Sequence, residues 1–210
     1  MKFNNRITQI FYYIKADILS SRAYMLKYIL VQLAVIFSLN GLSQRGFQMS
    51  IGGSGDDRAK TIINTHDGGY IIGGFASGFG IGQNDAFIIK YDSSNTIQWS
   101  RIIGTTNSDN IWDIIETTDT CYVVTLDERK SSRRDLRVVK LSSNGNIIWN
   151  KWYDHSGVEV GNFIVENTRG YIILGQTSSI PSRGDESILI QIDKKGDFIW
   201  NKTVGDGGNN

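Results

Sequence analysis

The stretch YDSSNTIQW, residues 91–99, has two counterparts further along the chain, LSSNGNIIW at 141–149 and IDKKGDFIW at 192–200. Each of the three reads as the end of one strand, a tight turn and the start of a second strand that carries a tryptophan. Trp99, Trp149 and Trp200 are separated by 50 and 51 residues. A period near 50 residues made of short strands is typical of a radially repeated β-architecture.

Other residues repeat with the same period. A tyrosine opens the second apolar segment of each copy, at Tyr70, Tyr122 and Tyr171. An acidic residue precedes the first segment of each copy, at Asp57, Asp109 and Glu159. A further series of acids introduces the third segment, at Asp85, Asp135 and Asp185. Glu186 takes that last place when copy three is aligned from its downstream turn, so we expect a one-residue slip in the preceding loop.

The turn before each tryptophan contains a residue that adopts the left-handed conformation at low cost, namely Asn95, Gly145 and Gly196. Three residues earlier stands a side chain that can accept hydrogen bonds from the turn backbone, namely Asp92, Ser142 and Asp193. A fixed turn places the indole four residues later reproducibly between neighbouring units. The periodicity therefore favours packing residues over ligand platforms for the three tryptophans.

Each copy contains four segments rich in strand-forming residues, which predicts an all-β fold. In copy one they lie at 59–65, 70–77, 85–92 and 96–104, and copy two begins with a strand at 111–118. Four antiparallel strands are the content of one propeller blade, so we predict a partial β-propeller of about three four-stranded blades. The predicted blade units are 52–104, 105–153 and 154–204, preceded by a leftover last strand at 45–51.

Three blades are too few to close a ring, because propellers have about four to eight. We therefore expect the chain to be a fragment of a longer protein or part of an oligomer, in which further blades complete the ring. A β-trefoil, which also has three copies of four strands, is the alternative. The residues KTVGDGGNN, at 202–210, begin a fourth copy and argue against the trefoil.

The N-terminal residues predict export. An apolar run at 28–39 follows Lys27 and precedes small residues, which indicates a signal peptide over 25–43 with cleavage after Ser43. The run is shorter than the about 20 residues of a membrane span, and an uncleaved anchor is the alternative. Residues 1–24 read as a spurious extension, with translation starting at Met25. We expect a secreted or cell-surface protein that has no stable membrane span after cleavage, with the propeller repeats over 44–210.

The residues GGSGDDRAKTIINTHDGGYIIGGFASGFGIGQNDAFIIKYDSSNTIQW, at 52–99, resemble the repeat of secreted bacterial β-propeller proteins. That repeat combines GG-x-x-x-D, DGGYI-x-x-G, D-x-x-x-I-K-x-D and a closing tryptophan. The resemblance covers about 47–210 and implies an exported multi-repeat protein of lectin-like or uncharacterised type. The turn and its tryptophan are also similar to the docking motif of quinoprotein propellers, shortened by one residue. Departures from the repeat occur at Ser142, Arg169, Gly170 and Gln191.

Charge and composition limit the partners and cofactors. The formal net charge of +1 offers no field that would attract nucleic acid or an anionic membrane. A basic cluster is interleaved with Asp127, Glu128 and Asp135 and reads as a solvated hairpin tip; it comprises Arg129, Lys130, Arg133 and Arg134. Carboxylates on glycine-rich loops suit calcium, which makes candidate ligands of Asp56, Asp57, Asp109 and Glu159. A carboxylate that recurs once per repeat more often caps a turn, so no cofactor is expected.

No catalytic set of Ser, His and Asp can be assigned. His66 and His155 read as exposed turn residues, Cys121 as a small buried residue, and the tripeptide at 183–185 as a chance match to an adhesion motif. We expect a non-catalytic scaffold that binds a glycan or a protein through its loops. Candidates for stacking on a sugar are Phe79, Trp112 and Trp152, with core packing as the alternative for the two tryptophans. The alternative function is an extracellular enzyme of quinoprotein or hydrolase type with its active site in missing blades.

Overall fold

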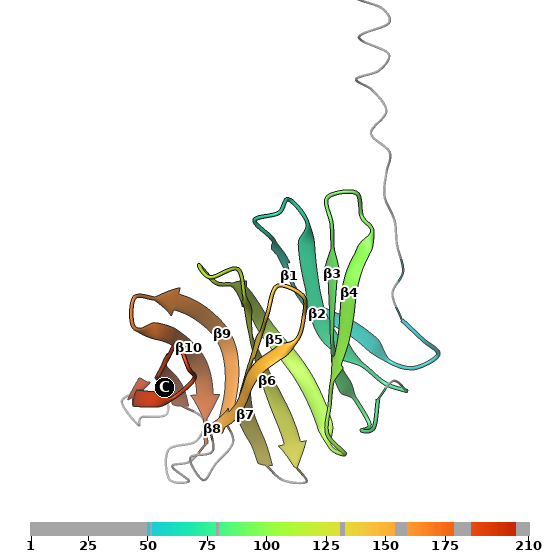
Figure 1. Ribbon diagram of the computed structural model, residues 1–210. Coiled ribbons are helices and arrows are strands. Elements are labelled where there is room, and N and C mark those ends of the chain that lie inside the picture. Colours follow the sequence, from blue (N-terminus) through green and yellow to red (C-terminus); the bar gives the residue numbers. More distant parts are fainter. Residues whose placement is uncertain are drawn as a thin grey trace, which may run out of the picture. The chain divides into compact units, whose positions relative to one another are not determined.

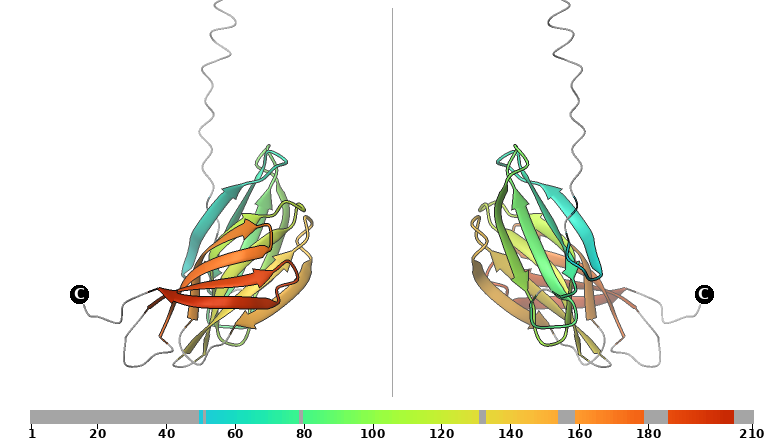
Figure 2. Two further views of the ribbon diagram at one scale, coloured as in Figure 1. Left: turned by 90° about the vertical axis from the view of Figure 1, so that its left-hand side faces the viewer. Right: turned by 90° about the vertical axis from the view of Figure 1, so that its right-hand side faces the viewer.

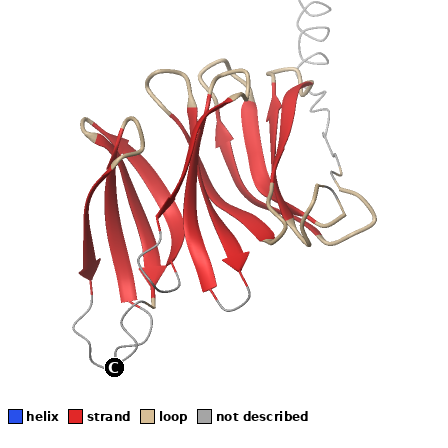
Figure 3. Cartoon of the chain, turned by 60° about the horizontal axis from the view of Figure 1, so that its bottom comes forward, coloured by secondary structure: helices blue, strands red, loops and turns tan. Residues whose placement is uncertain are grey.

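The computed structural model describes residue 50 and residues 52–78, 80–130, 133–153, 159–178 and 186–204. The chain divides into two units, Met1–Ser50 and Ile51–Asn210, and the described strands all belong to the second. The predictions for 1–24, for 25–43 and, apart from Ser50, for the strand at 45–51 fall outside the described residues. Throughout the described ranges the regular elements are strands, which confirms the all-β prediction (Figure 3). These ranges include no helix of the length and apolarity that a membrane crossing requires.

The strands form three four-stranded antiparallel sheets, in each of which neighbours along the chain are neighbours in the sheet (Figure 1). The first sheet consists of β1 (Asp57–Asn64), β2 (Tyr70–Ala76), β3 (Asp85–Tyr91) and β4 (Ile97–Ile103). The second consists of β5 (Ser108–Glu116), β6 (Tyr122–Lys130), β7 (Arg133–Leu141) and β8 (Ile147–Tyr153). The third consists of β9 (Glu159–Asn167), β10 (Gly170–Thr177), β11 (Glu186–Asp193) and β12 (Phe198–Val204).

Connections of two kinds lie at opposite ends of each sheet, because successive strands run antiparallel. At one end, the turn end, the first strand of a sheet joins the second and the third joins the fourth, always through five residues or fewer. At the other end, the loop end, lie the connection between second and third strands and the links between sheets. The strand bounds leave residues 77–84, 104–107, 131–132, 154–158 and 178–185 for these connections, so their lengths range from two to eight residues; 79, 131–132, 154–158 and 179–185 lie outside the described residues.

The sheets stack face to face, and one apolar core lies between each neighbouring pair (Figure 2). Val139 packs with Ile88 and Ile111 between the first and second sheets. Val138, the preceding residue, packs with Ile190 between the second and third sheets. Consecutive strand residues point to opposite faces, so the continuous apolar run of β7 serves both cores. Each fully buried isoleucine or valine contributes about 1.5–3 kcal/mol by removal from water.

Trp99 joins the first sheet to the second at the turn end. Its Nε1 donates a hydrogen bond of 2.9 Å to the carbonyl oxygen of Ser143, in the β7–β8 turn. Its ring lies on Gly145, where an added Cβ would come within 2.7 Å of Cε3, and packs at a tilt 5.8 Å from the Tyr122 ring. Gly145 thus meets two demands, a φ of 75° and space for the indole.

Trp149 joins the second sheet to the third through the same contacts. Its Nε1 donates to the carbonyl oxygen of Lys194 at 3.3 Å, and its ring lies on Gly196 and 6.3 Å from the Tyr171 ring. Trp200 differs, because no described sheet packs beyond the third, and it is 36% exposed. Trp99 and Trp149 thus lie between sheets as expected, and for Trp200 the expectation stays a prediction.

The turns before the tryptophans have the same internal bonds. Asn95, Gly145 and Gly196 have φ values of 66°, 75° and 79°. Asp92 Oδ1 accepts from the backbone of Ser94 and Thr96, and Asp193 Oδ1 accepts from that of Lys195 and Asp197. Ser142 Oγ makes the corresponding contact with the backbone of Asn146 at 3.1 Å. A serine can therefore replace the aspartate at this position without changing the turn.

A polar pair, with its strand member buried, closes the other turn of each sheet. Lys90, 1% exposed, donates to Asp67 at 2.8 Å, and Lys140 donates to Asp119 at 2.7 Å. In the third sheet the pair is Gln191 with Asn167, at 3.0 Å. Asn167 Oδ1 also accepts from the backbone of Arg169 and Gly170, as Asp67 accepts from that of Gly69. Gln191 and Asn167 thus replace the lysine and the aspartate together, so a neutral hydrogen-bonded pair stands where the other two sheets have an ion pair.

Candidate binding face at the loop end

The first strand of each sheet has an acidic residue at its first or second position, next to the loop-end segments. Asp109 Oδ2 accepts from the backbone N–H of Thr105 at 2.7 Å and from its hydroxyl at 2.9 Å, and Oδ1 accepts from Arg137 at 3.1 Å. Burial raises the pKa of the Asp109 carboxyl, and the bonds from Thr105 and Arg137 act against this rise. Asp57 Oδ2 likewise accepts from the backbone of Gly53 at 2.6 Å. These two carboxylates therefore hold loop backbone in place.

The third strand of each sheet also has an acid among its first three residues. Asp85, fully buried, accepts from the backbone of Gly82 at 3.1 Å. Asp135 accepts from Lys130 at 2.6 Å. Glu186 pairs with Thr177 as Asp85 pairs with Ala76, so Glu186 occupies this place in the third sheet; Asp185 lies outside the described residues.

The four candidate calcium ligands do not come together. Asp56 is exposed and forms an ion pair with Arg58 at 3.0 Å, whereas Asp57, Asp109 and Glu159 begin three different sheets. Across the ranges that the structure describes, no three His, Cys, Asp or Glu side chains are grouped as metal ligands. The contacts seen at Asp57 and Asp109 are those of loop caps.

The second sheet has a polar cluster at the loop end that the described parts of the other sheets lack. Arg137 Nε donates to Asn150 Oδ1 at 2.8 Å, and its guanidinium carbon lies 4.8 Å from the centre of the Trp152 ring. Trp152 Nε1 donates to Glu128 Oε2 at 2.7 Å. Asn107 donates to the other oxygen of Glu128 at 2.8 Å. We call Asn107, Glu128, Arg137, Asn150 and Trp152 the Trp152 cluster.

Trp112 is held in a similar way on the other side of the sheet. Its Nε1 donates to Asp127 Oδ1 at 2.8 Å, and Lys60 lies 5.3 Å from its ring centre. Asp127 and Glu128 are consecutive residues of β6, whose side chains point to opposite faces. Trp112 and Trp152 therefore do not share one platform, and the third stacking candidate, Phe79, falls among the residues not described.

The basic cluster at 129–134 is exposed for the most part, but the acids interleaved with it are buried. Lys130 contacts Asp135 and, at 3.7 Å, Glu128, and Arg134 lies 3.6 Å from Asp127. Asp127, Glu128 and Asp135 are all at least nine-tenths buried. Burial raises the pKa of Asp127, against the hydrogen bond from Trp112 and the charge of Arg134. The expectation of a solvated tip therefore fits the basic residues and is wrong for the acids.

The remaining sequence candidates lie apart from this cluster. His66 is exposed in the β1–β2 turn, and its backbone N–H donates to Glu116 at 2.8 Å. Cys121 is free and partly exposed at the start of β6, rather than buried. His155 and the tripeptide at 183–185 are not among the described residues.

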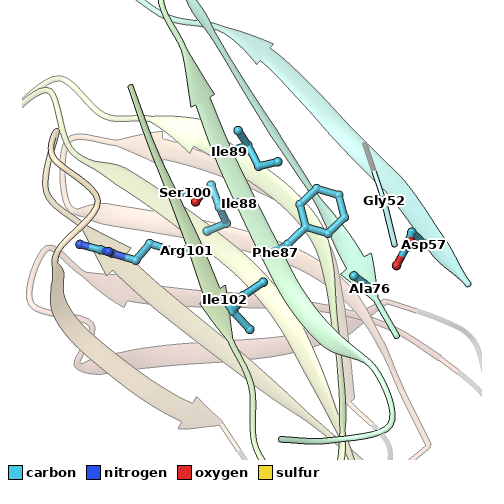
Figure 4. Close-up of a pocket in the computed structure, with 9 residues that line it drawn as sticks. All are labelled: Gly52, Asp57, Ala76, Phe87, Ile88, Ile89, Ser100, Arg101 and Ile102. Carbon is cyan, nitrogen blue, oxygen red and sulfur yellow. The ribbon is translucent and has the colours of Figure 1, made fainter. Parts of the chain in front are cut away.

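A hollow of about 240 Å³ lies on the first sheet at the place that corresponds to the Trp152 cluster (Figure 4). Ala76, Phe87 and Ile102 line it, together with Asp57 and Ser100. In the strand pairing Phe87 lies opposite Ile102 as Arg137 lies opposite Trp152. The first sheet thus has an apolar lining where the second has charged and aromatic side chains.

The comparisons with known proteins add no assignment. No protein-family model matches the chain, and no curated protein matches it. Function therefore has to be inferred from the geometry of the described sheets, in which the loop end combines variable segments with anchored carboxylates and one exposed indole.

Proposed function

We propose that this chain forms three consecutive blades of an exported β-propeller that acts as a non-catalytic binding scaffold. The observation that supports it best is that Trp99 and Trp149 each dock on the turn between the third and fourth strands of the following sheet. Two successive interfaces with the same contacts are what a tandem array of blades requires. Further blades, from a longer chain or another copy, complete the ring of about four to eight.

Strand pairing supports a propeller over a β-trefoil. Within the described residues, the pairings join strands of the same sheet, and the three sheets contact one another through their faces. A trefoil pairs strands of different repeats in a common barrel. Separate sheets that stack on their faces are the arrangement of blades.

Export is supported by the sequence alone, through the signal-peptide pattern at 25–43 and the resemblance to secreted bacterial propeller repeats. The mature protein then belongs outside the cell or on its surface. A glycan or a protein is the ligand class that suits such a location, and the scaffold needs no metal or cofactor for this role.

The loop end is the proposed binding face. Its segments range from two to eight residues, whereas the turn-end connections range from two to five. Variable loops on a rigid scaffold are where recognition normally lies. Buried carboxylates such as Asp109 hold the loop bases, so the loops can vary without loosening the sheets.

A matched pair of charge reversals tests the proposal. Labelled secreted protein is applied to arrays of oligosaccharides and of extracellular proteins, and bound spots are compared for Arg129→Glu, exposed at the loop end, and Lys195→Glu, exposed at the turn end. We expect weaker binding for the first variant only. Equal loss in both, or no binding to either array by the parent protein, would contradict the proposal. Amino-terminal sequencing of the secreted product, with Gln44 expected first, checks export.

A further inference from the structure

The charged members of the Trp152 cluster, Arg137 and Glu128, occupy positions that hold uncharged residues in the other two sheets. Arg137 lies directly opposite Trp152 in the β7–β8 pairing. The corresponding pair is Phe87 with Ile102 in the first sheet, and Ile188 with Thr203 in the third. Glu128, opposite Asp135, corresponds in the same way to Ala76 and Thr177.

Folding does not require charge at these positions. Arg137 and Glu128 are each 5% exposed, and burying charged groups generally stabilises a fold less than burying apolar groups of similar size. The first sheet forms with Phe87 and Ala76 at the same places. A costly set of polar residues in one repeat of three indicates a role other than packing.

The cluster fixes the orientation of Trp152 and leaves much of its ring open. Arg137 lies over one face of the ring, 4.8 Å from the ring centre, and Glu128 holds the indole N–H at 2.7 Å. Both supporting side chains are themselves fixed, by Asp109 and Asn107 respectively. Trp152 is nevertheless 45% exposed, so the exposed area belongs to its edge and to the face away from Arg137.

We propose that the Trp152 cluster binds a sugar ring of a glycan, stacked on the open face of the indole. A pyranose has an apolar face of C–H groups and a rim of hydroxyls, and an indole with a polar surround matches both. The partly exposed amides of Asn107 and Asn150 provide donors and acceptors for those hydroxyls. This inference rests on the proposed function, because it places the ligand at the loop end.

The shape of the site favours a sugar over a flat aromatic ligand. Aromatic cofactors and drug-like ligands are generally enclosed on most of their surface in a concave, mainly apolar pocket. Trp152 instead stands at the end of the outermost strand β8, with one supported face and charged residues around it. A hydroxylated ring keeps its outer hydroxyls in water while it covers such a platform.

A repeat-swap variant provides the test. Glu128→Ala, Arg137→Phe and Trp152→Ile together install the residues that the first sheet has at these three places. Binding is measured on an array carrying cellohexaose, chitohexaose, xylohexaose and maltohexaose, and circular dichroism checks folding. We expect at least tenfold weaker binding for the swap variant and for Trp152→Ala. Trp200→Ala, which removes an exposed tryptophan from the third sheet, should bind like the parent.

Three results would overturn the inference. The first is that the parent protein binds none of these oligosaccharides. If it then binds the array of extracellular proteins, the proposed scaffold function stands and only the sugar site is contradicted. The second is a folded swap variant that binds them as tightly as the parent, because the sugar would then contact other loop-end residues. Loss of binding in Trp200→Ala to the same extent would likewise count against the Trp152 cluster.

Discussion

The turn end and the loop end of these sheets are ordered by different forces. At the turn end, Trp99 and Trp149 lie on glycines of the following sheet, so shape decides which residues are accepted. At the loop end, buried carboxylates such as Asp109 hold the loop backbone, so charge and hydrogen bonding decide which residues are accepted there. The turn end can therefore keep the same indole contact from repeat to repeat while the loop end varies in length. Substitutions at each end test the two sides of this contrast.

The largest effect is expected at the loop end, from Asp109→Ala. Arg137, 5% exposed, would lose its charged partner, and the Thr105 backbone N–H would lose its acceptor. Removing one partner of a buried ion pair costs about 3–5 kcal/mol. Urea unfolding at pH 7 measures the free energy of unfolding. Asp109→Asn keeps an acceptor, so its free energy of unfolding should fall less. If Asp109→Ala were as stable as the parent, the buried pair would not be what orders the loop end.

The next effect is expected at the turn end, from Gly145→Asn. Asparagine accepts the left-handed conformation, as Asn95 shows with its φ of 66°, so the change isolates the contact with the indole. A Cβ at this position would lie 2.7 Å from Trp99 Cε3. We expect a loss of about 2–3 kcal/mol from overpacking, measured by urea unfolding.

The reverse change, Asn95→Gly, is the control for Gly145→Asn. Asn95 has the same place in the first sheet, where its side chain accepts a hydrogen bond from the Tyr70 hydroxyl at 3.1 Å. We expect a change within about 0.5 kcal/mol, as for most surface substitutions. Similar losses in the two variants would mean that the indole contact does not decide the residue at this position.

The smallest effect is a difference in acid sensitivity at the turn end. Burial raises the pKa of Asp119, but the hydrogen bonds from Lys140 and Thr117 outweigh this and bring it to about 2. A carboxyl with a depressed pKa in the folded protein stabilises it above its unfolded pKa of about 3.9, and this stability is lost as the pH falls towards the folded value. The double variant Asp119→Asn, Lys140→Gln copies the neutral pair of the third sheet, which does not titrate.

The double variant should therefore lose less stability than the parent between pH 5 and pH 2. The difference should stay below about 1 kcal/mol, because the Asp119 side chain is 55% exposed and water screens the pair. Urea unfolding at several pH values measures it, with Asp56→Asn as a control at an exposed ion pair. An identical pH dependence in parent and double variant would show that the Lys140 pair adds no acid-sensitive stability.

The repeated part of the fold could be predicted from the sequence because its signals are local. The strand positions follow from short apolar segments between turns, and Asn95, Gly145 and Gly196 mark turns by their conformational freedom. The slip at Glu186 was predictable from the downstream turn, and the strand pairing places Glu186 opposite Thr177. The start of β5 was predicted three residues late, because Ser108, Asp109 and Asn110 are polar and are held as a strand by pairing with β6.

The Trp152 cluster could be predicted only in part. Trp152 was a stacking candidate by residue type, but its partners lie on other strands or in a link between sheets. Their meeting depends on the pairing register, which no local pattern shows. A usable signal did exist, because alignment of the repeats places Arg137 where Phe87 and Ile188 stand. The exposure of Trp200 does not follow from the repeat pattern, since it depends on whether a further sheet covers the third.

The docking of Trp149 on Gly196 has a consequence for how such genes change in length. The ring belongs to one repeat and the glycine that it contacts belongs to the next, so a unit with glycine in this turn fits behind any other. Duplication of the second or third repeat, or deletion of one whole repeat, by unequal recombination leaves a glycine at every internal contact and demands no newly evolved one. Growth by intact modules is thus a short evolutionary step for this chain, whereas loss of half a module is not.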